Sequence, residues 1–302
     1  MPITLPPLSR RQFLARSAAA ASALALAPLL RGADVAQVDA DRFALLSDIH
    51  IAADRAKVSR MANMADHLVA AVKEVAALSP RPVAGFINGD LAFGTGESGD
   101  YATMLELLKP LRETGLPLHL TMGNHDHRAH FLEAVPAGQV DKSPVADRVA
   151  CLVESPKANW FVLDSLKETN KTPGVVGEEQ LKWLADALDA RASKPAIVMV
   201  HHNPDPDPKH NGLIDTAALL ELLAPRKHVK ALLFGHTHAW SVKEQDGLHL
   251  VNLPAVAYPF QDGYPVGWVD WHLADDGAKL ELRCVGPDHP QQGEKHELKW
   301  RA

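Results

Sequence analysis

Cysteine is scarce in this chain of 302 residues, which contains only Cys151 and Cys284. Two thiols cannot build a disulfide framework or a zinc site made of thiolates, so both classes are excluded. The sequence does not decide whether these two cysteines pair with each other. A positive charge excess is also missing, because 31 basic residues face 37 acidic ones for a formal charge of -6. A protein that binds a nucleic acid through a basic surface is therefore not expected.

A long hydrophobic run is absent too, and the longest apolar stretch covers only residues 17–30. Fourteen residues are too few to cross a bilayer of ~30 Å as a helix. The stretch follows Arg10, Arg11 and Arg16, and no acidic residue occurs before residue 34. A buried amphipathic helix is the alternative interpretation, but the stretch has no polar face. The pattern is typical of a secretory signal.

Residues 9–14, Ser-Arg-Arg-Gln-Phe-Leu, resemble the twin-arginine export motif. The resemblance implies a signal segment over residues 1–33 and passage through the twin-arginine export machinery after folding in the cytosol. The expected location is the periplasm. Residues 25–27 have the small side chains of a cleavage site, but Pro28 follows, so an uncleaved membrane tether remains open. Without the first 31 residues, 27 basic residues face 37 acidic ones, a charge of -10.

Short apolar runs alternate with helical patterns over most of the remaining chain, and a strand-rich tail follows. This order predicts one layered α/β domain over residues 41–302, with sheets packed face to face. The predicted strands are residues 43–46, 83–87, 116–122, 148–153, 160–163, 196–200 and 229–234, and the predicted helices are residues 54–78, 101–114, 128–135, 178–191 and 213–223. The tail segments 242–243, 248–253, 267–273 and 279–285 are predicted to be antiparallel strands.

Five short polar motifs each begin where a predicted strand ends. They are Asp48-Ile49-His50, Gly89-Asp90, Gly123-Asn124-His125-Asp126, His201-His202 and Gly235-His236-Thr237-His238. Each motif alone could be an ordinary turn or a loop cap. Strand ends of an α/β sheet converge on one crevice, however, and the three glycines let the backbone turn sharply and approach an ion closely. Together the motifs predict a binuclear metal site with oxygen and imidazole ligands, in which one carboxylate bridges.

The order of these motifs resembles that of the calcineurin-like metallophosphoesterase superfamily, and every element is present across residues 48–238. The resemblance implies a four-layer α/β/β/α sandwich of two mixed sheets. It also implies two divalent ions, for which Mn, Fe and Zn are all acceptable with these donors. Carried over by position, Asp48, His50 and His238 would hold the first ion, Asn124, His201 and His236 the second, and Asp90 would bridge them. His201 is preferred to His202 because it directly follows the strand; His202 would then lie beside the ligands or near the substrate.

Two such ions would lower the pKa of a bridging water, and the resulting hydroxide would attack phosphorus. His125 is then the expected general acid, because it follows a ligand without being one. Asp126 would orient His125 or keep it protonated, although a turn-capping aspartate is the alternative. His127 is a candidate for contact with the substrate at the rim of the pocket.

Residues 160–165, 180–184 and 211–213 are similar to secondary features of the branch that contains cyclic-nucleotide and glycerophosphodiester phosphodiesterases. The expected function is therefore that of an exported hydrolase of small phosphoesters, with phosphodiesters favoured. A broad-range phosphomonoesterase is one alternative. An exported metal-binding protein without activity is another, which is disfavoured because no ligand or acid is missing. The acidic charge disfavours a nuclease. The physiological substrate and the oligomeric state cannot be derived from the sequence.

Overall fold

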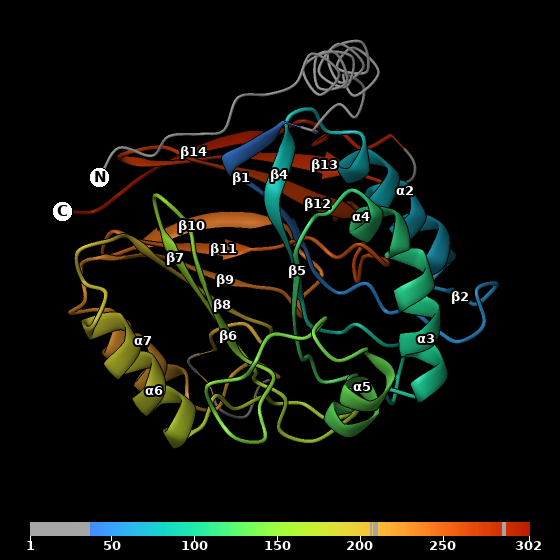
Figure 1. Ribbon diagram of the computed structural model, residues 1–302, viewed down its shortest axis with the longest axis horizontal. Helices are drawn as coiled ribbons and strands as arrows, with labels where there is room; N and C mark the ends of the chain where they lie inside the picture. The colour runs from blue at the N-terminus through green and yellow to red at the C-terminus, as the bar shows by residue number, and fades with distance from the viewer. Residues whose placement is uncertain (1–36, 206, 208–210, 286–287) are drawn as a thin grey trace, which may run out of the picture. The chain divides into compact units, whose positions relative to one another are not determined.

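Two six-stranded sheets form the centre of the protein in the computed structural model (Figure 1). The structure describes residues 37–205, 207, 211–285 and 288–302, and Val38–Ala302 is one compact unit. The predicted signal segment 1–33 lies outside the described residues. Within the described part of the chain, no helix is long and apolar enough to cross a membrane.

The first sheet contains the strand that opens the described chain. Its order is β14 (Lys295–Lys299), β13 (Gly277–Cys284), β12 (Gly267–Leu273), β1 (Val38–Leu46), β4 (Arg81–Asn88) and β5 (Leu118–Thr121). β1, β4 and β5 are parallel, whereas β12, β13 and β14 pair in antiparallel fashion. The sheet is therefore mixed, and the ends of its three parallel strands lie at one edge.

The second sheet is also mixed. Its order is β10 (Ser241–Gln245), β11 (Leu248–Asn252), β9 (Val229–Phe234), β8 (Ala196–Val200), β7 (Asn159–Leu163) and β6 (Cys151–Glu154). The four inner strands are parallel and the two edge strands are antiparallel to their neighbours. The tail was predicted to be antiparallel throughout, but β11 pairs in parallel with β9.

Side chains along β1 point alternately to the two faces of the first sheet and pack against a different layer on each face. Phe43 points into the space between the sheets, where its ring centroid lies 4.8 Å from that of Trp160 in β7. Ala44 and Leu46 point the other way, into the apolar layer under α2 (Met64–Ala76), α3 (Ser98–Leu107) and α4 (Lys109–Glu113).

The second sheet is covered on its outer face by α6 (Glu178–Asp189) and α7 (Thr216–Leu223) (Figure 1). The predicted four-layer α/β/β/α sandwich of two mixed sheets is thereby confirmed. Cys151 and Cys284 are free thiols in this fold.

The segment before α2 differs from the prediction of a helix over residues 54–78. The helix begins at Met64, and β2 (Val58–Ser59) and β3 (Ala62–Asn63) form a hairpin ahead of it. Arg60 and Met61 make the two-residue turn with φ of 47° and 65°. Left-handed backbone costs roughly 1–2 kcal/mol per residue that is not glycine. The side chain of Asn63 then accepts a hydrogen bond from the backbone N–H of Asp66 and caps α2.

Two further elements also differ from the prediction. The helix predicted over residues 101–114 is divided into α3 and α4, and Pro110 lies in the first turn of α4, where its missing N–H costs nothing. Strand β14 was not predicted.

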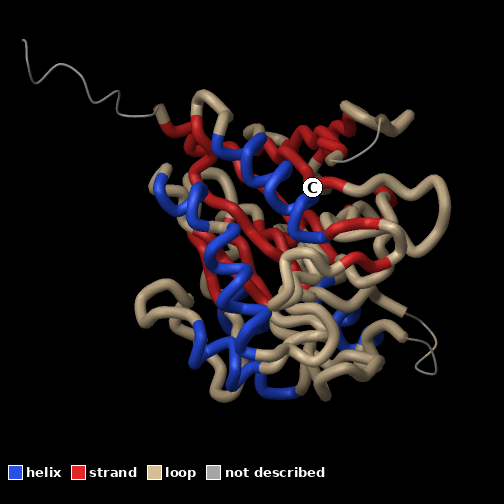
Figure 2. The backbone as a smooth tube through the Cα atoms, turned by 90° about the vertical axis from the view of Figure 1, so that its right-hand side faces the viewer, coloured by secondary structure: helices blue, strands red, loops and turns tan. Residues whose placement is uncertain are grey.

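Many of the loops gather beyond the strands at the bottom and right of Figure 2. The loops that follow the parallel strands of both sheets meet, because potential ligand atoms from them lie within 4.8 Å of one another. The five polar motifs begin directly after or within two residues of the ends of β1, β4, β5, β8 and β9. The loop after β5 continues directly into α5 (Arg128–Ala134). Strand ends of this kind are where α/β proteins build their binding sites.

Candidate metal centre

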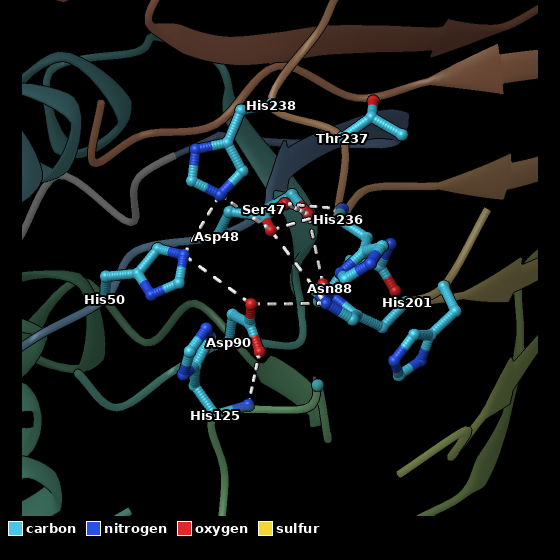
Figure 3. Close-up of polar contacts among 12 residues, drawn as sticks. Ser47, Asp48, His50, Asn88, Asp90, His125, His201, His236, Thr237 and His238 are labelled. Atoms are coloured by element: carbon cyan, nitrogen blue, oxygen red, sulfur yellow. Dashed lines mark hydrogen bonds and ion pairs between the residues drawn. The ribbon is translucent and has the colours of Figure 1, made fainter. Parts of the chain in front are cut away.

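Six of the seven predicted ligands, all except Asn124, lie together in Figure 3 and come from loops of both sheets. His236 is half-buried, and the other six, including Asn124, are buried. Potential donor atoms within 4.8 Å of one another define three overlapping groups, which are Asp48, His50 and His238; His50, Asp90 and His125; and Asp90, His201 and His236. The first group is the set predicted for the first ion, and the third contains Asp90, His201 and His236 of the set predicted for the second, without Asn124. The residues could therefore hold two neighbouring divalent cations.

Asp90 lies between the two groups. Its Oδ2 is 3.6 Å from Nε2 of His50 and 3.4 Å from Nε2 of His201 (Figure 3). Its Oδ1 accepts a hydrogen bond of 2.8 Å from the backbone N–H of His125. One carboxylate oxygen therefore faces an imidazole from each group, which is the position required of a bridging ligand.

The hydrogen bonds of the imidazoles leave lone pairs in the centre. Nδ1–H of His201 donates to the carbonyl of Asn88 at 2.8 Å, and Nδ1–H of His238 donates to that of Tyr258 at 2.5 Å. The Nε2 atoms of His238 and His50 are only 3.1 Å apart. Nε2 of His201 and Oδ1 of Asn124 are buried and have no hydrogen-bond partner. Acceptor atoms that converge with no hydrogen-bond donor between them are satisfied by cations. These ligand atoms therefore fit metal ions.

The electrostatics of the centre also favour cations. Burial alone would raise the pKa of Asp48, but His201 and His238 outweigh it and hold this pKa at about 2. For His201 burial lowers the pKa, whereas Asp90 and Asp48 raise it to about 10. Burial lowers the pKa of His50 to about 3. Two buried carboxylates thus keep the imidazole of His201 protonated, and a metal ion bound there would replace that proton.

The backbone is strained at the ligand positions. Asp48, His50, Asp90, His236 and His238 all have left-handed φ, between 44° and 67°. Such residues cluster at functional sites, where the surrounding structure holds them in place.

Two glycines of the motifs are required by close approach. A Cβ on Gly123 would lie 2.2 Å from Oδ1 of Asp90, and a Cβ on Gly235 would lie 2.5 Å from Oδ2 of Asp48. Both distances are shorter than any real contact. Any side chain at these two positions would therefore displace a candidate ligand.

Several supporting residues were missed by the sequence analysis. Ser47 Oγ donates to Asp48 at 2.5 Å, Asn88 accepts from His201, and the ring of Tyr258 lies on that of His50 at 5.2 Å. The polar residues Ser47 and Asn88 at the ends of apolar strands were a usable signal. Nothing local in the sequence pointed to Tyr258, since it reaches the site from a loop of the distant tail.

The candidate acid His125 is half-buried next to Asp90. Its Nδ1–H donates to the carbonyl of Gly94 at 2.8 Å, so this carbonyl orients the ring. Asp126 was expected to orient His125, but no contact between the two side chains is found. The carboxylate of Asp126 accepts backbone N–H groups of Gly123, Leu91 and Ala92 instead. Asp126 thus joins the loop after β5 to the loop after β4.

Burial, together with the charge of Asp90, raises the pKa of Asp126 to about 7.

The backbone N–H of His127 donates to the hydroxyl of Tyr101. Nδ1 of His127 accepts the backbone N–H of His130 and so caps α5. These contacts give His127 a structural role in the loop.

His202 lies beside the candidate ligands, outside the three donor groups. Its ring is 4.7 Å from that of His236, its Nδ1 is 2.7 Å from Ser165 Oγ, and burial holds its pKa well below the usual range. His201, by contrast, shares a donor group with Asp90. The geometry therefore favours His201 over His202 as the second ligand from this motif.

A partly buried ion pair supports the loop that carries His125. Arg128 opens α5, and its Nε and Nη2 donate to the two carboxylate oxygens of Asp164 at 2.6 and 2.8 Å. The side chain of Gln180 binds the backbone N–H and carbonyl of Asp164. The segments 160–165 and 180–184, singled out in the sequence, therefore meet at this pair.

Comparison with known proteins agrees with this architecture. The family model of calcineurin-like phosphoesterases matches residues 41–240. The chain is 31% identical over 252 residues to the 3',5'-cyclic adenosine monophosphate phosphodiesterase CpdA of Pseudomonas aeruginosa, covering 78% of this chain and 86% of that protein. It is 26% identical to the glycerophosphodiester phosphodiesterase GpdQ of Enterobacter lignolyticus, covering 70% of this chain and 76% of that protein.

Among solved structures, a dimetal phosphatase from Danio rerio has the same fold, with a TM-score of 0.66 at 15% identity, covering 87% of this chain and 99% of that one. The matched segment 41–240 contains all five motifs of the centre. The chain therefore belongs to the calcineurin-like phosphoesterase family and is a metal-dependent phosphoesterase.

Proposed function

We propose that this protein is an exported phosphodiesterase that works with two divalent ions. The observation that carries the proposal is the position of Asp90. One of its oxygens faces the imidazole of His50 from the first donor group and that of His201 from the third. The similarity to CpdA and GpdQ, both named as phosphodiesterases, supports diesters over monoesters.

The residues divide between two ion sites and a proton donor. Asp48, His50 and His238 would hold the first ion, Asn124, His201 and His236 the second, and Asp90 would contact both. Two ions bound there would lower the pKa of a bound water and neutralise the charge of the phosphate.

His125 would protonate the leaving oxygen. Its Nδ1–H is held by the carbonyl of Gly94, so Nε2 is the nitrogen free to give a proton. The half-buried ring lies beside Asp90, next to the candidate ligands. This position suits a general acid, which has to reach the substrate without binding a metal.

The test compares hydrolysis of bis(p-nitrophenyl) phosphate and p-nitrophenyl phosphate by the purified protein, with and without chelator. We expect a higher kcat/KM for the diester and loss of both activities after chelation. A higher kcat/KM for the monoester would show that the protein is a phosphomonoesterase. Activity that survives complete removal of the metals would contradict the proposed centre.

Export and metal identity are tested on the full chain. Residues 9–14 support twin-arginine export, so the double variant Arg10→Lys, Arg11→Lys should accumulate in the cytosol whereas the unchanged chain reaches the periplasm. Folding before export would let the cytosol supply the ions, which favours Mn or Fe. Stoichiometric Zn in protein purified from the periplasm would contradict that assignment.

A further inference from the structure

Three side chains that can bind a metal meet at one edge of the sandwich, apart from the centre. The imidazole of His119, the carboxylate of Asp141 and the thiol of Cys151 have ligand atoms within 4.8 Å of one another, and none of the three belongs to a donor group of the centre. His119 lies in β5 and Cys151 begins β6, which are edge strands of the first and the second sheet (Figure 1). Asp141 comes from the segment between α5 and β6. These three residues, the edge site, therefore connect the two sheets.

Hydrogen bonds and packing hold the edge site together. Nδ1 of His119 is 2.9 Å from Oδ2 of Asp141, and the thiol of Cys151 hydrogen-bonds to the same carboxylate. The ring of His119 packs against that of Phe86 with centroids 5.2 Å apart. Phe86 and Cys151 belong to the apolar layer between the sheets, and Cys151 is buried. The three side chains are therefore held close together before any ligand binds.

The order of these contacts excludes a catalytic thiol of the cysteine–histidine type. In such a site the histidine lies between the cysteine and the carboxylate, because it has to take the proton of the thiol. Here Asp141 hydrogen-bonds to both other residues. Burial and the charge of Asp141 also raise the pKa of the Cys151 thiol above its ordinary range. A thiolate at this position therefore needs a cation that neutralises it.

A zinc ion meets that requirement. Zinc accepts sulfur, nitrogen and oxygen ligands, at bond lengths of about 2.0–2.3 Å that place tetrahedral ligand atoms about 3.3–3.8 Å apart. Small rotations of the three side chains bring their ligand atoms to these separations. Binding moves the Nδ1 proton of His119 to Nε2 and releases the thiol proton to water, so one proton leaves for each zinc bound. Zinc with one thiolate, one carboxylate and one neutral imidazole carries no net charge, which lowers the cost of burial between two sheets.

A cavity gives the edge site a route of entry and a fourth ligand. It has a volume of about 410 Å³ and is lined by His119 and Asp141. Three protein ligands leave one tetrahedral position, which a water molecule from the cavity would fill. Arg112 lines the same cavity and donates to Gln139, and a zinc site without net charge does not repel its guanidinium.

We propose that His119, Asp141 and Cys151 form a metal site separate from the centre, which binds one zinc ion and links β5 to β6. The thiolate distinguishes it from the centre, whose candidate ligands are carboxylate, amide and imidazole groups. Sulfur ligands favour zinc over manganese and magnesium, which prefer oxygen. The proposal does not depend on the phosphodiesterase function, because the two sites share no ligand.

The first test uses cobalt, because a cobalt–thiolate bond gives a charge-transfer absorption in the near ultraviolet that oxygen and nitrogen ligands do not give. Titration of the metal-free full chain with Co²⁺ should produce this absorption, and added Zn²⁺ should abolish it. Cys151→Ser should lack the absorption, whereas Cys284→Ser, which removes the other thiol, should keep it. No absorption in the unchanged protein, or the same absorption in Cys151→Ser, would overturn the proposal.

His119→Gln and Asp141→Asn separate a three-ligand site from a thiol that binds metal alone. Both side chains are partly exposed, so we expect both variants to fold, as circular dichroism can verify. Loss of a residue next to a ligand weakens metal binding about 10–100-fold, so loss of a ligand should weaken cobalt binding about tenfold or more. An unchanged cobalt affinity in both variants would overturn the proposal, because Cys151 would then bind metal without these partners.

Metal analysis gives an independent measure. After dialysis against zinc, the unchanged protein should contain one zinc per chain more than Cys151→Ser, and equal contents would overturn the proposal. Only zinc that remains in Cys151→Ser then counts against Mn or Fe in the centre. Hydrolysis of bis(p-nitrophenyl) phosphate should not change in this variant, because the centre is unaltered. If no diester is hydrolysed but the cobalt absorption depends on Cys151, the proposed phosphodiesterase function fails and the edge site stands.

Discussion

The substitution Asp164→Asn tests how the loop of His125 is held. Each carboxylate oxygen of Asp164 accepts one N–H from Arg128 and one backbone N–H, from Val149 or Leu166. In asparagine an NH2 group replaces one oxygen, so two of these four donors lose their acceptor. A hydrogen bond to a charged group contributes about 1.5–3 kcal/mol, and Asp164 is fully buried. We expect the free energy of unfolding to fall by about 3–5 kcal/mol.

Urea unfolding followed by tryptophan fluorescence measures this loss, and thermal unfolding should show a Tm lower by about 6–15 °C. The matched control is Asp186→Asn, which breaks the exposed pair with Lys182 and should cost less than about 1 kcal/mol. A second readout is kcat, which should fall in Asp164→Asn because α5 carries the loop of His125. A loss of stability below 1 kcal/mol in Asp164→Asn would refute the reasoning, because it would mean that Arg128 and the two backbone N–H groups find other acceptors.

Three further predictions concern the centre and the first sheet. Asp90→Asn should lose both ions and all activity together, as measured by metal analysis and assay; ions retained at full occupancy would contradict its bridging position. His125→Ala should keep the ions but lower kcat by about 10²–10⁴, most for alkyl diesters with poor leaving groups, and full activity on such a diester would exclude it as the acid. Burial would raise the pKa of Asp270, but its hydrogen bonds with Arg42 and His272 lower it to about 2. The ionised form is therefore favoured by folding, and about 1–2 kcal/mol, allowing for solvent screening, is present above pH 4 and lost between pH 4 and pH 2. The stability difference between the unchanged protein and Asp270→Asn should shrink over this range, and a constant difference would refute the sign.

The residue types at the strand ends made the centre predictable. The strand Ala196–Val200, for example, is apolar throughout, and His201 directly after it is not an ordinary turn residue. The contacts between the loops were not predictable in the same way. Asp126 binds the backbone N–H groups of Leu91 and Ala92, more than thirty residues away, and such pairings depend on the fold rather than on local sequence.

The errors in secondary structure have local causes. The apolar spacing of α2 continues upstream through Met61, and the left-handed turn at Arg60 and Met61 contains neither glycine nor asparagine. Asn63, which caps α2, was the usable signal for the start of the helix. Strand β14 buries only Leu298 well, so it lacks the alternating apolar pattern by which strands are recognised. Pairing with β13 rather than burial makes it a strand.

The left-handed backbone at five of the seven candidate ligands lowers the stability of the protein. Each of these residues stores strain of roughly 1–2 kcal/mol that glycine would not. The ions offset this strain only while they are bound, so the metal-free protein carries its full cost. Removal of the ions by chelator is therefore expected to lower the Tm of the unchanged protein. The stability of the protein is thereby tied to its metal content.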